Sequence, residues 1–275
     1  MASSSNAPIG IFDSGVGGLS VWRALVQRLP HEGTLYLADQ AHVPYGPRPL
    51  AEVTNYAKGI TRFLLAHGAK LIVVACNTAS GAALHTLRET FPAMPFVGME
   101  PAVKPAAEAT RSGVVGIIAT PATFQGKLFQ QLVQRFTSEV QLETQTCPGL
   151  VELIETGTQD APETEILLRQ YLQPLVERGI DQLVLGCTHY PFLRQAMQRV
   201  VGERVTLIDP APAVARQIER RLRRRRIQAL PGTGQHTFFT TGDPLTFAEM
   251  AQQLVGYTGA VNGVHWGKDC EIERR

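Results

Sequence analysis

The chain of 275 residues contains few cysteines, no long apolar run and almost no excess of charge. Four cysteines are too few for the disulfide framework of a small secreted protein, and in a chain of this length they indicate reduced thiols. No C-x-x-C or H-E-x-x-H spacing occurs, so the sequence predicts no metal site. Residues 1–7 lack the basic flank and the apolar core of a secretory signal. We therefore expect a cytoplasmic protein with no membrane segment.

The charge balance argues against a general attraction to nucleic acid or to anionic membranes. The chain has 26 basic and 24 acidic side chains, which leaves a formal net charge of +2. The one exception is an arginine-rich run at residues 220–226 (RRLRRRR). We interpret this run as a solvated helix end, where positive charge interacts favourably with the helix dipole. Nucleic-acid binding through the run stays an alternative.

One short pattern occurs twice in the chain. Residues 71–79 (LIVVACNTA) and 183–191 (LVLGCTHYP) both run from apolar residues through a small residue and a cysteine to hydroxyl-bearing residues. An amphipathic helix pattern follows each time, so Cys76 and Cys187 are expected where a buried strand leads into a helix. Such places bind ligands in open α/β sheets, and the helix dipole lowers the pKa of a thiol. The repetition indicates a duplicated half-site.

Two thiols in equivalent positions suit a reaction that inverts a carbon centre. One group removes a proton from one face of the carbon, and the other returns a proton to the opposite face. Substrate and product are mirror images, so the acid of one direction is the base of the reverse reaction. A pair of like groups meets this demand.

Strands alternate with helices along the chain, which predicts mainly parallel α/β sheets. Proline-rich passages near residues 98–101 and 209–212 are expected to carry the chain between two domains. We predict a first domain of residues 1–98 with 211–275 and a second domain of residues 99–210. The predicted strands are residues 8–12, 34–38, 71–74, 96–98, 114–119, 140–146, 182–185, 206–208 and 236–240. Among the helices, one is expected through residues 124–132, one at residues 162–177, and one with Pro191 in its first turn. The glycines that follow the first strand are expected to allow a tight turn and close approach of the backbone to a ligand.

Three motifs in a fixed order make the chain resemble the glutamate racemases of the aspartate/glutamate racemase family. They are residues 12–18 (FDSGVGG), 76–78 (CNT) and 186–191 (GCTHYP), and the resemblance extends from about residue 9 to about residue 256. It implies two similar three-layer α/β domains with the active site in the cleft between them. It also implies cofactor-independent racemisation of L-glutamate to D-glutamate for peptidoglycan, carried out by a homodimer.

The resemblance implies a role for each residue of these motifs. Cys76 would take the proton from D-glutamate, with Asp13 in support, and Cys187 would take it from L-glutamate, with His189 in support. The substrate-binding residues would be Asp13, Ser14, Tyr45, Gly46, Asn77, Thr78, Thr120, Thr123, Thr188 and His189. Among these, Tyr45 and Gly46 match the Pro-Tyr-Gly element of the family within a proline-rich loop at residues 39–49.

Glu155 is the fifth catalytic candidate. In the family a glutamate follows a Cys-Pro pair and a hydrophobic run, and Glu155 matches it in residues 147–155 (CPGLVELIE). Glu152 stands where the family has a second proline, and we expect it to be solvated. The five lysines of the chain lie outside all these motifs, so we expect no pyridoxal phosphate and no other cofactor.

Other readings of the motifs stay open. An aspartate racemase would share the cysteine pair, although its second motif typically has glutamate at the position of His189. A hydrolase with Cys187 as nucleophile is a second alternative, which would leave the other matched cysteine unexplained. Some family members carry an N-terminal extension and depend on a cell-wall precursor for activity. Eight residues precede Ile9 here, so we expect activity without that activator.

Overall fold

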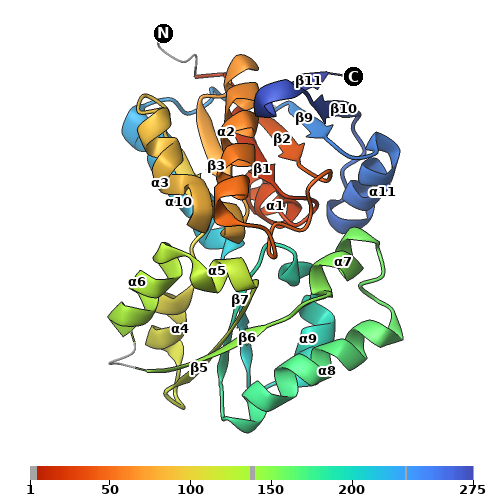
Figure 1. Cartoon of the computed structure of the whole chain (residues 1–275). Coiled ribbons are helices and arrows are strands. Elements are labelled where there is room, and N and C mark those ends of the chain that lie inside the picture. The colour runs from red at the N-terminus through yellow and green to blue at the C-terminus, as the bar shows by residue number, and fades with distance from the viewer. Residues whose placement is uncertain (1–4, 137–139, 233, 275) are drawn as a thin grey trace.

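The computed structural model describes residues 5–136, 140–232 and 234–274, which form two α/β halves, one above the other in Figure 1. The first half contains a sheet of seven strands in the order β11-β10-β9-β2-β1-β3-β4, and the second half a sheet of four in the order β6-β5-β7-β8. All neighbouring strands are parallel except β10 and β11. The prediction of an α/β protein with mainly parallel sheets is confirmed.

The strands of the first sheet are short, and most of them are buried. They are β1 (Ile9–Asp13), β2 (Thr34–Ala38), β3 (Leu71–Val74), β4 (Phe96–Gly98), β9 (His236–Thr240), β10 (Val261–Trp266) and β11 (Ile272–Arg274). The second sheet consists of β5 (Val114–Ala119), β6 (Gln141–Thr146), β7 (Gln182–Gly186) and β8 (Thr206–Ile208).

Helices connect the strands of both sheets. Those of the first half are α1 (Leu19–Arg28), α2 (Leu50–Ala66), α3 (Asn77–Thr90), α10 (Ala211–Arg225) and α11 (Pro244–Val255), with a 3₁₀ turn η2 (Lys268–Cys270). Those of the second half are α4 (Val103–Ala109), α5 (Pro121–Gln125), α6 (Lys127–Phe136), α7 (Leu150–Glu155), α8 (Pro162–Glu177) and α9 (Arg194–Val201), with η1 (Tyr190–Leu193).

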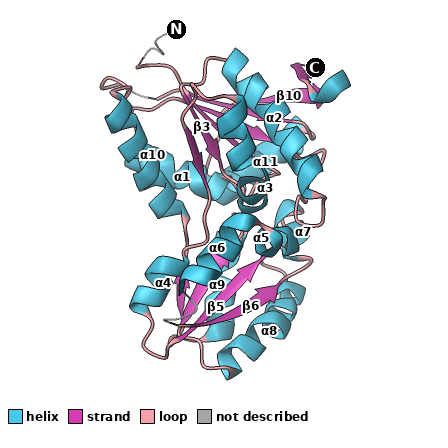
Figure 2. Ribbon diagram, turned by 60° about the vertical axis from the view of Figure 1, so that its left-hand side comes forward, coloured by secondary structure: helices cyan, strands magenta, loops and turns pink. Residues whose placement is uncertain are grey.

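Each sheet lies between two layers of helices, because its central strands are apolar on both faces (Figure 2). In β1, Ile9 and Ile11 pack in the same core as Leu25 of α1, whereas Phe12 packs in the core that contains Ile60 of α2. The second sheet divides in the same way between a core shared with α8 and α9 and a core shared with α4. Successive side chains of a strand point to opposite faces, and this alternation produces the three layers.

The structure differs from the sequence-based expectation in three places. The single helix expected through residues 124–132 is two helices, because Gly126 has an extended backbone (φ −66°, ψ 139°) that ends α5. Pro191 lies in the turn η1 that precedes α9 rather than in the helix itself. The strands β10 and β11 were not expected, and they extend one edge of the first sheet beyond β9.

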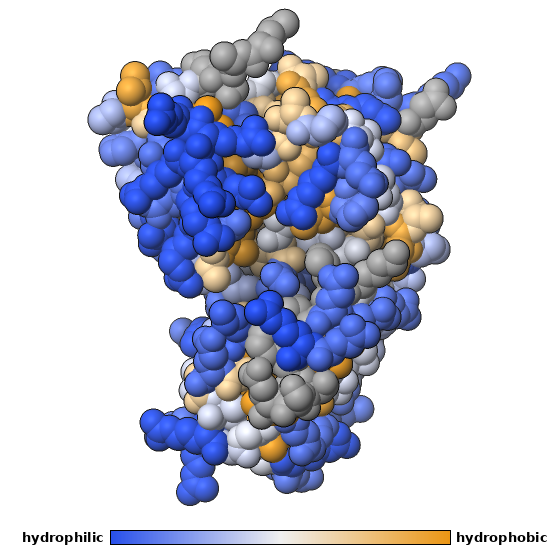
Figure 3. Space-filling view, turned by 90° about the vertical axis from the view of Figure 1, so that its left-hand side faces the viewer, coloured by the Kyte–Doolittle hydropathy of each residue, from blue (hydrophilic) through white to orange (hydrophobic). Residues whose placement is uncertain are grey.

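The chain crosses from the first half to the second after β4 and returns before α10. The domain limits at residues 98, 99 and 211 stay a prediction. Residues 223–226 of the arginine run are exposed at the end of α10, which agrees with a solvated helix end. Figure 3 shows the strongly hydrophilic surface on this side of the first half. Within the described ranges, no helix is long and apolar enough to cross a bilayer.

Candidate active site

The carboxyl ends of both sheets point toward one small cavity between the halves. The first half contributes Ser14, Pro44, Tyr45, Gly46, Cys76, Asn77 and Thr78, and the second half contributes Thr120, Thr123, Val151, Gly186, Cys187, Thr188 and His189. About 10 Å³ of the cavity is open to the centre of a water molecule, which is about the space that one water needs. The halves are thus nearly closed on each other here.

Cys76 lies between β3 and α3, as the sequence predicts. It is the N-cap residue of α3, and its Sγ accepts a hydrogen bond from the Ala79 amide at 3.5 Å. Its thiol is buried and lies beside the Asp13 carboxylate. Burial raises the pKa of the Cys76 thiol well above its usual value, and the negative charge of Asp13 raises it further. The protonated thiol is therefore the favoured form of Cys76.

Asp13 ends β1 directly behind Cys76 and is fully buried. Its Oδ2 accepts hydrogen bonds from the Gly18 amide at 2.6 Å and from the Thr188 hydroxyl at 3.4 Å. Burial raises the pKa of the Asp13 carboxyl, although the positive charge of His189 and the neighbouring amides oppose the rise. Since Thr188 belongs to the second half, this carboxylate also connects the two halves.

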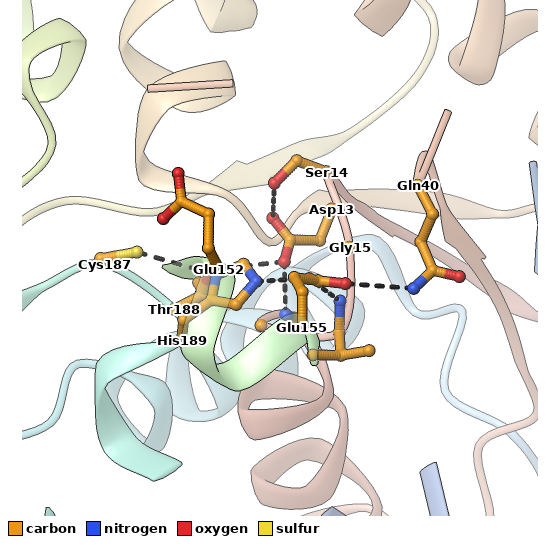
Figure 4. Close-up of polar contacts among 12 residues, drawn as sticks. Asp13, Ser14, Gly15, Gln40, Glu152, Glu155, Cys187, Thr188 and His189 are labelled. Carbon is orange, nitrogen blue, oxygen red and sulfur yellow. Dashed lines mark hydrogen bonds and ion pairs between the residues drawn. The ribbon is translucent and has the colours of Figure 1, made fainter. Parts of the chain in front are cut away.

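Cys187 follows β7 and lies next to a buried histidine and a carboxylate (Figure 4). Its Sγ is 3.8 Å from Nδ1 of His189, whose Nε2 is 2.6 Å from Oε1 of Glu155. Burial alone would lower the pKa of His189, but the contacts with Cys187 and Glu155 raise it well above its usual value. Burial would raise the pKa of Glu155, yet His189 and other donors lower it. The pair is therefore charged, and its positive member faces Cys187.

Polar groups line the remaining walls of the cavity. Oγ1 of Thr120 lies 2.9 Å from Oγ1 of Thr78 and 2.9 Å from Oγ1 of Thr123, so one hydroxyl group bridges the two halves. Thr120 is also the N-cap residue of α5, so this threonine both lines the cavity and caps a helix. Asn77 is buried, and neither atom of its side-chain amide has a hydrogen-bond partner among the described residues. A buried amide facing a cavity without a partner is suited to bind a ligand.

A family model described as Asp/Glu/Hydantoin racemase matches residues 9–218. The chain belongs to this racemase family. It is 50% identical over 256 residues to a glutamate racemase of Roseiflexus sp. (strain RS-1), which covers 92% of this chain and 94% of the relative. The solved glutamate racemase isoform from Bacillus anthracis has a TM-score of 0.86 and 34% identity, over 94% of this chain and 98% of its own.

A third relative was solved with ligands. The Escherichia coli glutamate racemase, in complex with L-glutamate and the activator UDP-MurNAc-ala, has a TM-score of 0.80 and 33% identity, over 93% of this chain and 97% of its own. The resemblance expected from the three motifs is confirmed, and the chain is an isomerase. A cysteine hydrolase is no longer needed to explain Cys187, because these relatives are racemases over nearly their whole length.

Every predicted site residue of this racemase lies at or directly behind the cavity. Asp13 and Glu155 lie behind it, beside Cys76 and His189, and the other candidates line its wall. Glu152 is exposed, as expected. In the part of the chain that the structure describes, no group of three or more His, Cys, Asp or Glu side chains could hold a metal ion. The roles of the individual residues stay predictions.

Sequence reasoning missed how the glycine loop of the racemase is used. We expected Gly15 and Gly17 to let the backbone approach a ligand, but each leaves room for a side chain of the second half. A Cβ at Gly15 would overlap the Glu155 carboxylate, and a Cβ at Gly17 would overlap the His189 ring. The Val16 amide between them donates to Oε1 of Glu155 at 2.7 Å. The spacing of the glycines indicates that another group approaches this loop closely. Nothing in the order of residues along the chain identifies Glu155 and His189 as the side chains that do so.

Gln40 was also missed. Its Nε2 donates to Oε2 of Glu155 at 3.1 Å, so both oxygens of that carboxylate are bound from the first half. Gln40 follows β2 and lies at the start of the proline-rich loop. A glutamine in a loop has no sequence signature of this kind, and its role depends on how the two halves meet.

Proposed function

We propose that this racemase interconverts L-glutamate and D-glutamate by proton transfer to and from two thiols, Cys76 and Cys187. The observation that carries the proposal is that both thiols line one cavity, each from a different half of the molecule. The choice of substrate is supported by the names of the relatives from Roseiflexus and Bacillus anthracis and by the L-glutamate bound to the Escherichia coli relative.

In the L-to-D direction the thiolate of Cys187 removes the α-proton of L-glutamate. The Cα–H bond breaks, an S–H bond forms, and the electron pair stays on the α-carbon and its carboxylate. Cys76 then donates its S–H proton to the opposite face, which leaves Cys76 as the thiolate and Cys187 as the thiol. The reverse reaction begins from that state. The electrostatics fit this order, since Cys76 favours the thiol and positive His189 can stabilise the Cys187 thiolate.

Asp13, His189 and Glu155 support the two thiols in this proposal. Asp13 accepts a hydrogen bond from the Cys76 thiol and thereby orients its proton. His189 contacts Sγ of Cys187 directly, and Glu155 keeps the imidazole ring charged and fixed. Each half of the reaction therefore has one titratable neighbour for its thiol.

The substrate would be bound by groups that already face the cavity. The hydroxyl groups of Ser14, Thr78, Thr120, Thr123 and Thr188 and the side chain of Asn77 can donate to its two carboxylates, and we include the main chain of Tyr45 and Gly46. Glutamate is much larger than a water molecule, so the halves must separate for it to enter. Closure then removes water from the reacting carbon.

The proposal extends to the biological setting. D-glutamate from this reaction would serve peptidoglycan synthesis. The four free cysteines need a reducing compartment, which supports a cytoplasmic location. A homodimer stays a prediction that sedimentation of the purified protein would test.

Proton NMR of L-glutamate and D-glutamate in deuterated buffer, without added cofactor, tests the proposal. Wild-type protein should remove the α-proton signal of both enantiomers as the optical rotation changes. Cys76→Ser and Cys187→Ser should each lower kcat at least ~100-fold, the usual scale for losing an acid or base. Cys270→Ser, which changes a thiol outside the cavity, should leave the rate unchanged.

Two results would contradict the proposal. Retention of the α-proton signal with both enantiomers, under reducing conditions, would exclude glutamate as the substrate. The same assay with aspartate would then test the alternative of an aspartate racemase. Full activity in either single-serine variant would instead exclude a mechanism that needs both thiols.

A further inference from the structure

A fully buried carboxylate, that of Asp39, lies at the start of the proline-rich loop of residues 39–49 and binds four side chains. Its Oδ1 accepts hydrogen bonds from Nε1 of Trp266 at 2.7 Å and from the Thr241 hydroxyl at 2.9 Å. Its Oδ2 accepts one from the Tyr45 hydroxyl at 2.6 Å and lies 2.9 Å from Nδ1 of His42. These donors come from three separate segments of the chain, which the carboxylate therefore holds together.

Two of the four donors belong to the loop that borders the cavity. Tyr45 and Gly46 line it, but the Tyr45 hydroxyl is bound to Asp39, so the ring and the main chain of Tyr45 are what it presents to a substrate. Among the described residues, the main-chain amides of Tyr45 and Gly46 donate to no protein group. The orientation of these amides depends on the position of the loop, which Asp39 fixes.

Trp266 reaches this carboxylate from the end of β10, beyond residue 218, where the family match ends. Its ring lies 5.3 Å from the ring of His42 and 5.5 Å from that of Tyr56, measured between centroids. The indole also packs against Gly59 of α2, where a Cβ would be 2.7 Å from the ring. The indole N–H is therefore held in place by contacts with His42, Tyr56 and α2.

We propose that Trp266 is a positioning residue that acts through Asp39 on the substrate-binding segment Tyr45–Gly46. This inference rests on the proposed function for the identity of the substrate. Neither Trp266 nor Asp39 lines the cavity, so their effect falls on substrate binding and not on proton transfer. When a buried carboxylate loses one hydrogen-bond donor, it moves toward the donors that remain. For Asp39 these include the Tyr45 hydroxyl, and a change in the position of Tyr45 displaces the loop. The strand β10 thus becomes part of the binding machinery.

The test compares Trp266→Phe with Trp22→Phe, the only other tryptophan of the chain. Both substitutions keep an aromatic ring and remove one indole N–H, and Trp22 donates to Thr34 in the core, away from the loop. Trp266→Phe should raise the KM for glutamate about 5-fold and change kcat less than about 2-fold. This is the result expected when the loss of one hydrogen bond weakens the binding of the substrate and of the transition state equally. Trp22→Phe should leave both constants unchanged.

Hydrogen–deuterium exchange supplies a readout that does not depend on activity. Amides of residues 42–48 should exchange faster in Trp266→Phe than in wild-type protein and at the wild-type rate in Trp22→Phe. Tyr45→Phe, which removes the other contact with Asp39, should raise KM by a similar factor. The double variant Trp266→Phe/Tyr45→Phe should then raise KM by less than the product of the two factors, since both act through one carboxylate.

Two outcomes overturn the inference. Unchanged KM and unchanged exchange in Trp266→Phe would mean that the indole N–H does not position the loop. An equal rise of KM in Trp22→Phe would indicate a general effect of losing stability. If wild-type protein racemised neither glutamate enantiomer, the proposed function would fail, while faster exchange in Trp266→Phe would still show that Trp266 holds the loop.

Discussion

Cys76 and Cys187 occupy equivalent positions at the ends of two strands, but their neighbours differ in charge. An aspartate carboxylate lies beside Cys76, and a histidine that its contacts with Cys187 and Glu155 keep charged despite burial lies beside Cys187. The reaction proposed here is symmetric, whereas the site is not. Burial and the Asp13 charge favour the thiol form of Cys76, which is the proton donor in the proposed L-to-D direction.

The His189–Glu155 pair makes stability depend on pH. A raised pKa of His189 contributes stability that is complete below its unfolded value of about 6.5 and lost as the pH rises through the folded value. A lowered pKa of Glu155 contributes stability above its unfolded value of about 4.3, which is lost as the pH falls through the folded value. Between the two unfolded pKa values, about 4.3 and about 6.5, the pair stabilises the fold fully.

We predict that Glu155→Gln lowers the unfolding free energy by about 3 kcal/mol near pH 5.5, because a charged, buried histidine loses its partner. The loss should shrink as the pH rises through the raised pKa of His189, where wild-type protein gives up that proton. Urea unfolding from about pH 5.5 upward measures it. The half-buried Glu165, paired with Arg169 and Arg199, is the control, and Glu165→Gln should have a small effect that does not change over this range. A loss for Glu155→Gln that stays constant while His189 gives up its proton, followed by NMR, would contradict the prediction.

At the scale of elements, two helices contain an interior glycine for different reasons. In α3, a Cβ at Gly81 would meet only the Cα of Gly126, at 3.8 Å. In α2, a Cβ at Gly59 would overlap the main-chain oxygen of Cys270 and would press on Trp266. Glycine is therefore required in α2, where the segment after β10 crosses the helix, and is tolerated in α3.

Alanine at these two positions should change stability in opposite directions. Gly81→Ala should raise the unfolding free energy by about 0.5–1 kcal/mol, the gain in helix propensity. Gly59→Ala should lower it by about 1–3 kcal/mol, because a main-chain atom cannot move aside without displacing β10. Thermal unfolding of the two variants measures the difference. Stabilisation by Gly59→Ala would mean that the C-terminal segment does not pack on α2 in solution.

At the scale of the whole molecule, the closed cavity implies that the two halves move apart during each cycle. Gly81 of the first half and Gly126 of the second approach each other outside the cavity, and a Cβ at Gly126 would be 3.5 Å from the Cα of Gly81. Cysteines at positions 81 and 126 would therefore be close enough to form a disulfide. A covalent link there would hold the halves closed without changing a residue of the site.

We predict that the double variant Gly81→Cys/Gly126→Cys loses at least ~90% of its activity on oxidation, because substrate exchange needs the opening motion. Reduction should restore it. The single variants, oxidised and reduced in the same way, control for damage to Cys76 and Cys187. Full turnover by the oxidised double variant, with the disulfide confirmed by mass spectrometry, would show that substrate enters without separation of the halves.

The local sequence was sufficient for most elements of this fold. The strands at 34–38, 114–119 and 236–240 and the helix at 162–177 have the predicted limits, because apolar periodicity, glycine and proline act over a few residues. The strand β10 was missed because VNGVHW contains glycine and asparagine and alternates weakly. Its pairing with β9 makes it a strand, and that contact is tertiary.

The same division applies to the site. By itself the sequence determined that Cys76 and Cys187 end two buried strands and that a glycine loop follows the first strand, since these are local patterns. Only the tertiary structure decided that Glu155 fits against the glycine loop and that Trp266 binds Asp39. Those contacts join residues far apart in the chain. Their energy depends on how the halves and the sheet edges pack, and no local pattern records that packing.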